Sequence, residues 1–93
     1  MTWTIEYAAS VHKSVRKLDT KAQRRIRDFL EHRLPIIADP HGLGIPLTWA
    51  KHRDLWRYRV GDYRVVVEIN DEGRRILILR IAHRWAVYSR LPS

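Results

Sequence analysis

Residues 54–69, which read DLWRYRVGDYRVVVEI, decide the fold of this 93-residue chain. Apolar and polar residues alternate on both sides of Gly61-Asp62, and this alternation is the period of half-buried β-strands. Glycine and aspartate form a favoured two-residue hairpin loop, so the stretch is predicted to be an antiparallel hairpin. The loop places Val60 opposite Tyr63 and fixes the register of every pair behind it.

This register sorts the side chains of the hairpin onto two faces, because cross-strand partners share a face of a sheet. One face is apolar and is predicted to lie under helices: Trp56, Tyr58, Val60, Tyr63, Val65 and Val67. Arg57, Arg59 and Arg64 emerge together on the other face. Like charges placed opposite one another destabilise a sheet, whereas arginine binds phosphate bidentately. The three arginines therefore favour a phosphate-binding surface over a merely solvated one.

A third strand is predicted over residues 74–82, after a turn at residues 71–73 in which Gly73 supplies the left-handed position. Placing Asn70 opposite Arg74 sets Arg80 beside Arg64 on the open face. The same register adds three residues to the core: Leu77, Leu79 and Ile81. It leaves three apolar residues uncovered on the arginine face: Val66, Ile76 and Ile78. An uncovered apolar strip marks a partner site, so these three residues are expected to bind a protein partner.

The N-terminal half is predicted to contribute one strand and two helices. Residues 3–7 alternate, and Val11, Val15 and Leu18 recur at helical spacing. Thr20 and Gln23 have the spacing of a capping box at the start of a second helix. Pro35 is expected to end or kink that helix. The helix is expected to bury one apolar stripe, formed by Ala22, Ile26, Phe29 and Leu30.

The predicted fold is α+β, in the order β-α-α-β-β-β, with two helices packed on a mostly antiparallel sheet. Residues 1–93 are expected to form a single domain. Residues 38–54 are rich in proline and glycine and are predicted to be a long loop, which in so small a domain indicates a functional segment.

The charge of the chain predicts an anionic partner. The 18 lysines and arginines exceed the 10 acidic residues to give a net charge of +8, and 14 of the 18 are arginine. Such a charge implies a polyanion or an acidic protein as partner. The lack of cysteine, of a signal segment and of a membrane-length apolar run predicts a cytoplasmic protein. No metal-ligand spacing or cofactor motif is visible, so neither a metal ion nor a cofactor is expected.

Two segments carry a resemblance to a known family. Residues 54–69 resemble the central hairpin of RelE-type toxins of the RelE/ParE superfamily, and residues 81–88, IAHRWAVY, resemble their closing segment. The resemblance implies the toxin of a type II toxin–antitoxin system. Such toxins enter the ribosomal A site beside rRNA and cleave mRNA, and a small antitoxin wraps around them and neutralises them. Ala82 and the Trp85-Ala86 pair depart from the usual closing segment.

The resemblance also implies roles for single residues. Arg57, Arg59 and Arg64 match the basic active-site residues of the hairpin, Arg84 matches a basic residue of the closing segment, and Tyr88 matches its near-terminal tyrosine. Metal-independent cleavage needs a base for the ribose 2′-hydroxyl, cations for the phosphorane and an acid for the leaving oxygen. Arginine cannot act as a base, but histidine titrates near neutral pH. His83 is therefore a candidate for proton transfer. Arg80 and Trp85 are candidates for substrate binding.

Two other functions are compatible with the sequence. One is a ParE-like inhibitor of DNA gyrase, which shares the fold but does not cleave RNA. The clustered hairpin arginines and Tyr88 argue against it, because ParE-type chains generally lack both. The other is a non-catalytic basic module that binds nucleic acid or an antitoxin.

Overall fold

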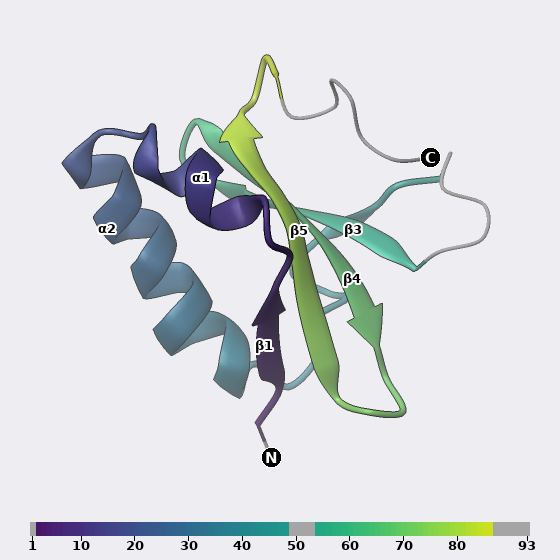
Figure 1. Cartoon of the computed structure of the whole chain (residues 1–93). Coiled ribbons are helices and arrows are strands. Elements are labelled where there is room, and N and C mark those ends of the chain that lie inside the picture. Colours follow the sequence, from purple (N-terminus) through teal and green to yellow (C-terminus); the bar gives the residue numbers. More distant parts are fainter. Residues whose placement is uncertain (1, 49–53, 87–93) are drawn as a thin grey trace.

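Two helices lie on one face of a five-stranded sheet in the computed structural model, which describes residues 2–48 and 54–86 (Figure 1). The elements in chain order are β1 (Thr4–Tyr7), α1 (Val11–Arg16), α2 (Thr20–Asp28), the π-helical turn η1 (Phe29–Arg33), the 3-10 turn η2 (Leu34–Ile36), β2 (Ile45–Pro46), β3 (Leu55–Val60), β4 (Tyr63–Asn70) and β5 (Arg75–His83). The order in the sheet is β1-β5-β4-β3-β2, and only β1 and β5 are paired in parallel. The predicted α+β fold is confirmed, with β2 as an additional edge strand inside the predicted loop.

The second helix begins one residue earlier than the sequence predicted. Asp19 is its N-cap, and the Asp19 carboxylate accepts a hydrogen bond of 2.7 Å from the amide of Ala22. The predicted capping box of Thr20 and Gln23 is wrong, because Gln23 Nε2 instead donates to the carbonyl of Leu18. The predicted apolar stripe is confirmed, and all four of its residues are buried: Ala22, Ile26, Phe29 and Leu30.

The register of the central hairpin is confirmed pair by pair. Val60 lies opposite Tyr63, Arg59 opposite Arg64, and Arg57 opposite Val66. The helix-covered face holds the main core, in which Tyr58 and Val65 are fully buried and Trp56 and Tyr63 pack at the margin.

The register between β4 and β5 differs from the prediction by one residue. Asn70 lies opposite Arg75, so the turn has four residues and Arg74, with φ of 50°, takes the left-handed position assigned to Gly73. A shift of one residue turns every side chain of a strand to the other face. Ile76 and Ile78 therefore belong to the core, with 0% exposure, and Leu77 faces away from it.

A β-bulge then shifts the register by a second residue, which returns the side chains beyond it to their predicted faces. Val67 pairs with Ile78 while Val66 pairs with Arg80, so Leu79 is the extra residue. Beyond the bulge Ile81 points into the core, as predicted. Leu79 does not join that core, because it packs against a second apolar cluster on the outer face, formed by Leu47, Leu55 and Val66.

The predicted apolar strip for a protein partner is therefore wrong. Ile76 and Ile78 lie under the helices, and Val66 is 0% exposed in the cluster that includes Leu47. The loop before β3, whose place no periodic pattern indicates, supplies this cover.

No helix of the described residues combines the length and apolarity needed to span a bilayer.

Candidate nucleic-acid interface

The three hairpin arginines line one small cavity on the outer face of the sheet. This cavity, the arginine pocket, has a volume of about 180 Å³ and is lined by Leu43, Ile45, Arg57, Arg59 and Arg64. The strand β2 forms one wall because Ile45 pairs with Arg57 at the sheet edge. The predicted gathering of the arginines on one face is confirmed. The two apolar wall residues were not foreseen, since a two-residue strand leaves no periodic pattern in the sequence.

The arginine pocket concentrates positive charge. Arg59 and Arg64 are direct cross-strand partners, a pairing that costs free energy unless an anion or solvent screens it. Arg64 Nη1 donates to the carbonyls of Gly61 at 3.0 Å and of Tyr63 at 2.9 Å, which holds its guanidinium against the hairpin turn. The pocket lining consists of three guanidinium groups and two apolar side chains. The arrangement is suited to binding a phosphate.

Arg80 lies two residues along β4 from its predicted partner. The bulge sets it opposite Val66, and Ala82 occupies the place opposite Arg64. Arg80 Nη2 donates to the carbonyl of Ala86 at 3.0 Å, so its guanidinium braces the segment after β5 and does not line the arginine pocket.

Arg84 and Trp85 form a stacked pair next to the hairpin turn. The Arg84 guanidinium carbon lies 4.5 Å from the centre of the Trp85 ring, and 78% of Trp85 is exposed. The amide of Arg84 donates to the carbonyl of Asp62 at 2.9 Å, which ties this segment to the loop between β3 and β4. An exposed indole beside a guanidinium is a suitable platform for stacking a nucleobase.

His83 lies on the opposite side of the sheet from the hairpin arginines. It is the cross-strand partner of Tyr63, and the two rings meet edge to face at 5.6 Å. Tyr63 belongs to the helix-covered face, so the structure does not bring His83 together with Arg57, Arg59 or Arg64. Tyr88 lies outside the described residues.

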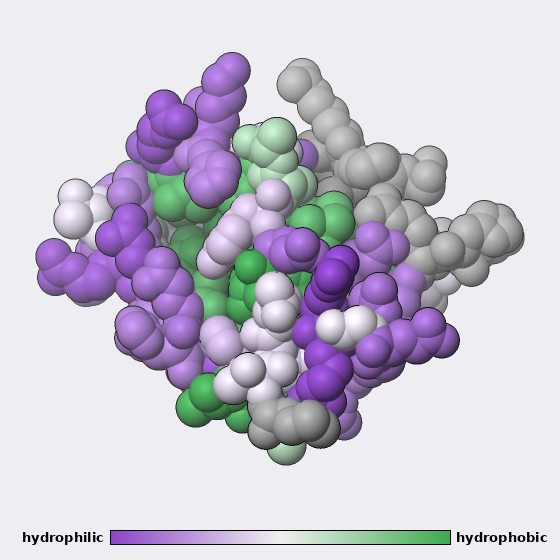
Figure 2. All heavy atoms as spheres, turned by 60° about the horizontal axis from the view of Figure 1, so that its bottom comes forward, coloured by the Kyte–Doolittle hydropathy of each residue, from purple (hydrophilic) through white to green (hydrophobic). Residues whose placement is uncertain are grey.

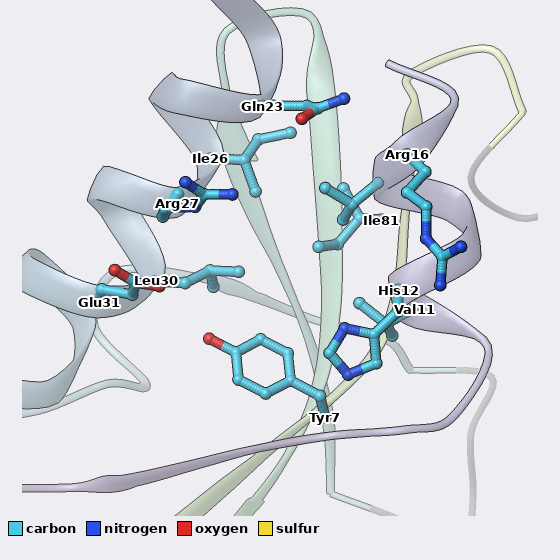
Figure 3. A pocket seen from close by; sticks show the side chains of 11 residues that line it. Tyr7, Val11, His12, Arg16, Gln23, Ile26, Arg27, Leu30, Glu31 and Ile81 are labelled. Carbon is cyan, nitrogen blue, oxygen red and sulfur yellow. The ribbon is translucent and has the colours of Figure 1, made fainter. Parts of the chain in front are cut away.

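A larger hollow lies between the two helices (Figure 3). It has a volume of about 560 Å³ and an apolar floor that includes Ile26, Leu30 and Ile81. Arg16 of α1 and Arg27 of α2 stand at its two sides. We call this hollow between the helices the helix groove. On the face of the molecule drawn in Figure 2, apolar side chains reach the surface beside a band of hydrophilic side chains.

Tyr7 and Glu31 also line the helix groove. Partial burial, and next the Glu31 carboxylate, raise the pKa of Tyr7 above its ordinary value. The Tyr7 hydroxyl is therefore neutral at physiological pH and can donate a hydrogen bond to an occupant.

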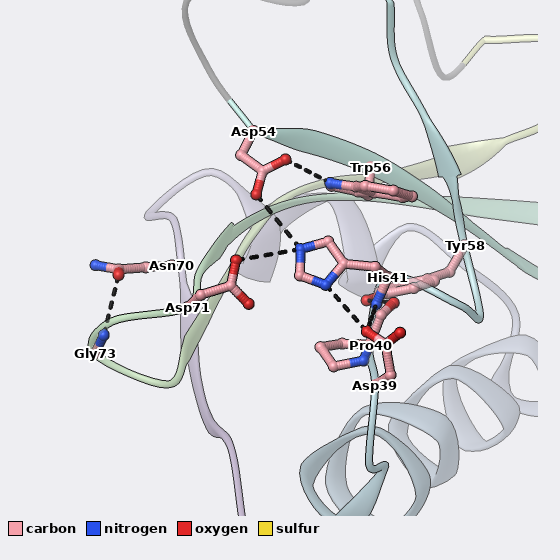
Figure 4. Close-up of polar contacts among 9 residues, drawn as sticks. All are labelled: Asp39, Pro40, His41, Asp54, Trp56, Tyr58, Asn70, Asp71 and Gly73. Carbon is pink, nitrogen blue, oxygen red and sulfur yellow. Dashed lines mark hydrogen bonds and ion pairs between the residues drawn. The ribbon is translucent and has the colours of Figure 1, made fainter.

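A polar cluster joins three segments near the N-terminal end of β3 (Figure 4). His41 Nδ1 lies 3.1 Å from Asp39 Oδ1, and His41 Nε2 lies 3.5 Å from Asp54 Oδ2 and 3.4 Å from Asp71 Oδ2. Burial alone lowers the pKa of His41, but the hydrogen bond to Asp39 and the carboxylates of Asp71 and Asp54 raise it above its ordinary value. The sequence gives no signal for this cluster, because the histidines of the chain share no regular spacing and the three carboxylates come from distant positions.

The loop that carries His41 is also held by a hydrogen bond from the core of the domain. The Tyr58 hydroxyl donates to the carbonyl of Pro40 at 2.8 Å inside the core. Burial, and next the Asp39 carboxylate, raise the pKa of Tyr58 well above its ordinary value, so the hydroxyl stays protonated and remains a donor. The start of the loop is thus anchored, and Leu43 and Ile45 follow a few residues later.

The sequence and the fold are both similar to known toxins. Residues 5–88 match the family described as the ParE toxin of the type II toxin–antitoxin system, parDE. Toxin RelE of Mycobacterium tuberculosis (strain ATCC 25618 / H37Rv) is 43% identical over 58 residues, which cover 62% of this chain and 59% of that relative. The match thus spans less than two thirds of the relative's length.

Solved structures of toxin–antitoxin complexes have the same fold. A chain of the RelBE2 complex from Mycobacterium tuberculosis has a TM-score of 0.74 and 25% identity, with 90% of this chain and 93% of that chain covered. A chain of the archaeal RelE–RelB complex from Pyrococcus horikoshii OT3 has a TM-score of 0.64 and 31% identity, with 98% and 100% covered. The chain therefore belongs to the ParE toxin family of type II toxin–antitoxin systems, within the RelE/ParE superfamily.

Proposed function

We propose that the protein is a ribosome-dependent endoribonuclease that cleaves mRNA in the A site, with the arginine pocket as the site of the reaction. The observation that carries the proposal is the convergence of Arg57, Arg59 and Arg64 on one cavity of the outer sheet face. The similarity to Toxin RelE supports RNA as the substrate.

The pocket supplies cations for an internal attack. The ribose 2′-oxygen forms a bond to the adjacent phosphorus, the bond from phosphorus to the 5′-oxygen breaks, and a 2′,3′-cyclic phosphate remains. Negative charge grows on the phosphoryl oxygens as the pentacoordinate state forms, and arginines fixed around those oxygens stabilise it. Arg64 is already held at the turn by two carbonyls, so little reorganisation is needed on binding.

The arginines leave proton transfer to other groups. A base must take the proton of the 2′-hydroxyl, and an acid must give one to the leaving 5′-oxygen. His83 is on the far side of the sheet from the pocket, so Tyr88, which resembles the near-terminal tyrosine of RelE-type toxins, is the candidate within this chain. The ribosome is the other source of such a group.

Arg80, Arg84 and Trp85 extend the proposed interface beyond the scissile phosphate. The tie from Arg84 to Asp62 sets the stacked pair of Arg84 and Trp85 beside the turn that holds Arg64. In this proposal the indole stacks on a base of the mRNA or of rRNA, and Arg84 contributes charge. Arg80 keeps the segment in position through the Ala86 carbonyl.

The proposed protein partner is an acidic antitoxin. The two similar chains from Mycobacterium tuberculosis and Pyrococcus horikoshii OT3 were each solved in a toxin–antitoxin complex. In this chain the helix groove, with its apolar floor and its arginines at both sides, fits an amphipathic acidic segment by shape and by charge.

The test is cleavage of mRNA in a translation extract, with the RNA ends mapped by primer extension. The parent chain is expected to give cuts in phase with codons, and Arg64→Ala is expected to give none at equal protein level. Arg24→Ala is the matched control, because Arg24 is an exposed arginine of α2 outside both cavities. Intact mRNA with the parent chain would refute the proposal.

The second candidate is a gyrase inhibitor, which the family description as a ParE toxin favours. Cultures in which the parent chain is expressed distinguish the two functions, because mRNA and chromosomal DNA can be analysed in the same cells. Gyrase-dependent DNA breaks together with intact mRNA would assign the protein to the gyrase inhibitors. Neither effect would indicate a non-catalytic binding module.

A further inference from the structure

The cluster around His41 places three potential metal ligands from distant parts of the chain next to one another. His41 comes from the loop after η2, Asp54 precedes β3, and Asp71 lies in the turn after β4 (Figure 4). Their nearest ligand atoms all lie within 4.8 Å of one another. Two of the three are aspartates, but the imidazole of His41 makes the set a mixed nitrogen and oxygen ligand group.

The separations fit a coordination shell better than a set of hydrogen bonds. His41 Nε2 lies 3.4 Å from Asp71 Oδ2 and 3.5 Å from Asp54 Oδ2, whereas N–H···O bonds measure about 2.7–3.2 Å. Tetrahedral zinc with bonds of about 2.0–2.2 Å places neighbouring ligand atoms about 3.3–3.6 Å apart. The distances from His41 Nε2 to the two carboxylates thus already match those between neighbouring ligands of such a shell.

Two of the ligands are oriented by a second layer of contacts. Asp39 Oδ1 holds His41 Nδ1 at 3.1 Å, which leaves Nε2 directed at the two other carboxylates. The Trp56 indole donates to Asp54 Oδ1 at 2.7 Å, which leaves Oδ2 directed at His41. Carboxylate contacts of this kind on the second nitrogen are typical of histidines that bind metal ions. The imidazole is also packed edge to face on the Trp56 ring at 4.9 Å.

The surroundings are acidic in a protein that is otherwise basic. An adjacent hollow is lined by five carboxylates and a single arginine: Asp54, Asp71, Glu6, Glu68, Glu72 and Arg75. With Asp39, six of the chain's 10 acidic residues gather at this end of the sheet. Crowded carboxylates repel one another, and a divalent cation among them removes that repulsion.

From this arrangement we infer that His41, Asp54 and Asp71 bind a divalent transition metal ion of the kind that accepts imidazole and carboxylate together, such as Zn²⁺. The ion fastens the loop before β2 to the start of β3 and to the β4–β5 turn. This site lies at the opposite end of β3 from the Gly61-Asp62 loop, so its role is to hold the loop that carries Leu43 and Ile45. The inference does not depend on the proposed nuclease activity.

The experiment is titration of the full, untagged chain with ZnCl₂ at slightly alkaline pH, followed by calorimetry and by thermal unfolding. Saturable 1:1 binding with a rise in Tm is expected for the parent chain. The variants His41→Gln and Asp71→Asn should lose both effects. Asp28→Asn is the matched control, because Asp28 is an exposed carboxylate of α2 that belongs neither to the ligand group nor to the adjacent hollow. Asp39→Asn should weaken binding roughly 10–100-fold.

A second measurement keeps the inference testable if a variant fails to fold. Mn²⁺ added to the isotopically labelled parent chain should broaden the indole N–H signal of Trp56 before those of Trp3 and Trp85. Absence of binding, binding that His41→Gln and Asp71→Asn retain, or broadening that spares Trp56 would overturn the inference. Those results would leave His41 as a protonated partner of the three carboxylates.

Discussion

Arg57, Arg59 and Arg64 show how much a two-residue turn determines at the level of single side chains. The Gly61-Asp62 loop admits one register, so the shared face of the three arginines could be predicted from the sequence alone. Arg80 could not be placed in the same way. Its position depends on a four-residue turn and a bulge, and each of these shifts the register by one residue. The sequence does not indicate the length of the turn, because the left-handed residue is Arg74 and not the adjacent glycine. It does not indicate the bulge either, because the residues around it are all ordinary strand residues.

The position of His83 yields a prediction about proton transfer. His83→Gln should leave the rate of single-turnover mRNA cleavage on programmed ribosomes nearly unchanged, because the sheet separates this ring from the arginine pocket. Tyr88→Phe should slow cleavage by about 10²–10⁴-fold while ribosome binding persists, as expected for loss of an acid–base group. A large rate loss for His83→Gln, with ribosome binding intact, would return His83 to the reaction. Parental rates for both variants would assign the proton transfer to the ribosome.

At the level of elements, the helices were predicted from periodicity, but the start of α2 was placed one residue too late. Aspartate and threonine are both good N-caps, and they stand side by side at residues 19 and 20. The structure uses Asp19, and the chain continues from α2 through a π-helical and a 3-10 turn before it leaves the helix near Pro35. Proline lacks the amide that a further α-helical turn would need, so the sequence did predict where the helix stops.

The cap of α2 can be tested against that of α1. Asp19→Ala should lower the free energy of unfolding by about 1 kcal/mol, because it removes the acceptor of the Ala22 amide. For a domain of this size the expected fall in Tm is roughly 4–8 °C. Ser10→Ala is the control, since Ser10 caps α1 without a side-chain hydrogen bond and its Tm should hardly change. Equal shifts in the two variants would show that the Asp19 contact contributes nothing specific.

The loop before β3 offers a second matched pair. A Cβ atom at Gly44 would lie 2.9 Å from the Arg57 carbonyl oxygen and 2.9 Å from the Tyr58 ring, whereas at Gly42 the nearest atom is 3.6 Å away. Gly44→Ala should therefore push β2 away from β3 and cost about 1–3 kcal/mol of stability. It should also reduce mRNA cleavage, because Leu43 and Ile45 flank the substituted position. Gly42→Ala should be near parental in thermal unfolding and in cleavage, and an equally stable Gly44→Ala variant would contradict the close packing.

At the level of the whole molecule, the sheet separates two surfaces for which we propose different partners. The outer face holds the arginine pocket, and the helix side holds the helix groove. The sequence predicted the layers. It assigned the antitoxin to the outer face because the predicted register between β4 and β5 was one residue off and turned Ile76 and Ile78 to that face. The His41 cluster could not be predicted either. Its members at positions 41, 54 and 71 meet only after the sheet is assembled.

The helix groove gives a prediction about complex formation. Arg27→Glu reverses a charge at the side of the groove and should weaken the antitoxin complex by at least about tenfold, most strongly at low salt. Arg24→Glu changes the net charge equally but lies outside the groove, and it should have little effect. The measurement is titration calorimetry of the toxin with the product of the neighbouring gene at two salt concentrations. Equal weakening by the two variants would show that the antitoxin responds to overall charge and not to this groove.

The parallel pairing of β1 with β5 determines when the sheet can be completed during synthesis of the chain. Thr4 lies opposite Arg75 and Tyr7 opposite Ile78, so within residues 2–48 and 54–86 the first strand pairs only with the last one. Sheets closed by such distant contacts form slowly, because a long chain segment must be ordered first. The emerging polypeptide can form its helices early, but β1 has no neighbouring strand among the described residues until β5 has left the ribosome. A protein proposed to attack translation thus cannot complete this sheet until the ribosome has synthesised and released β5.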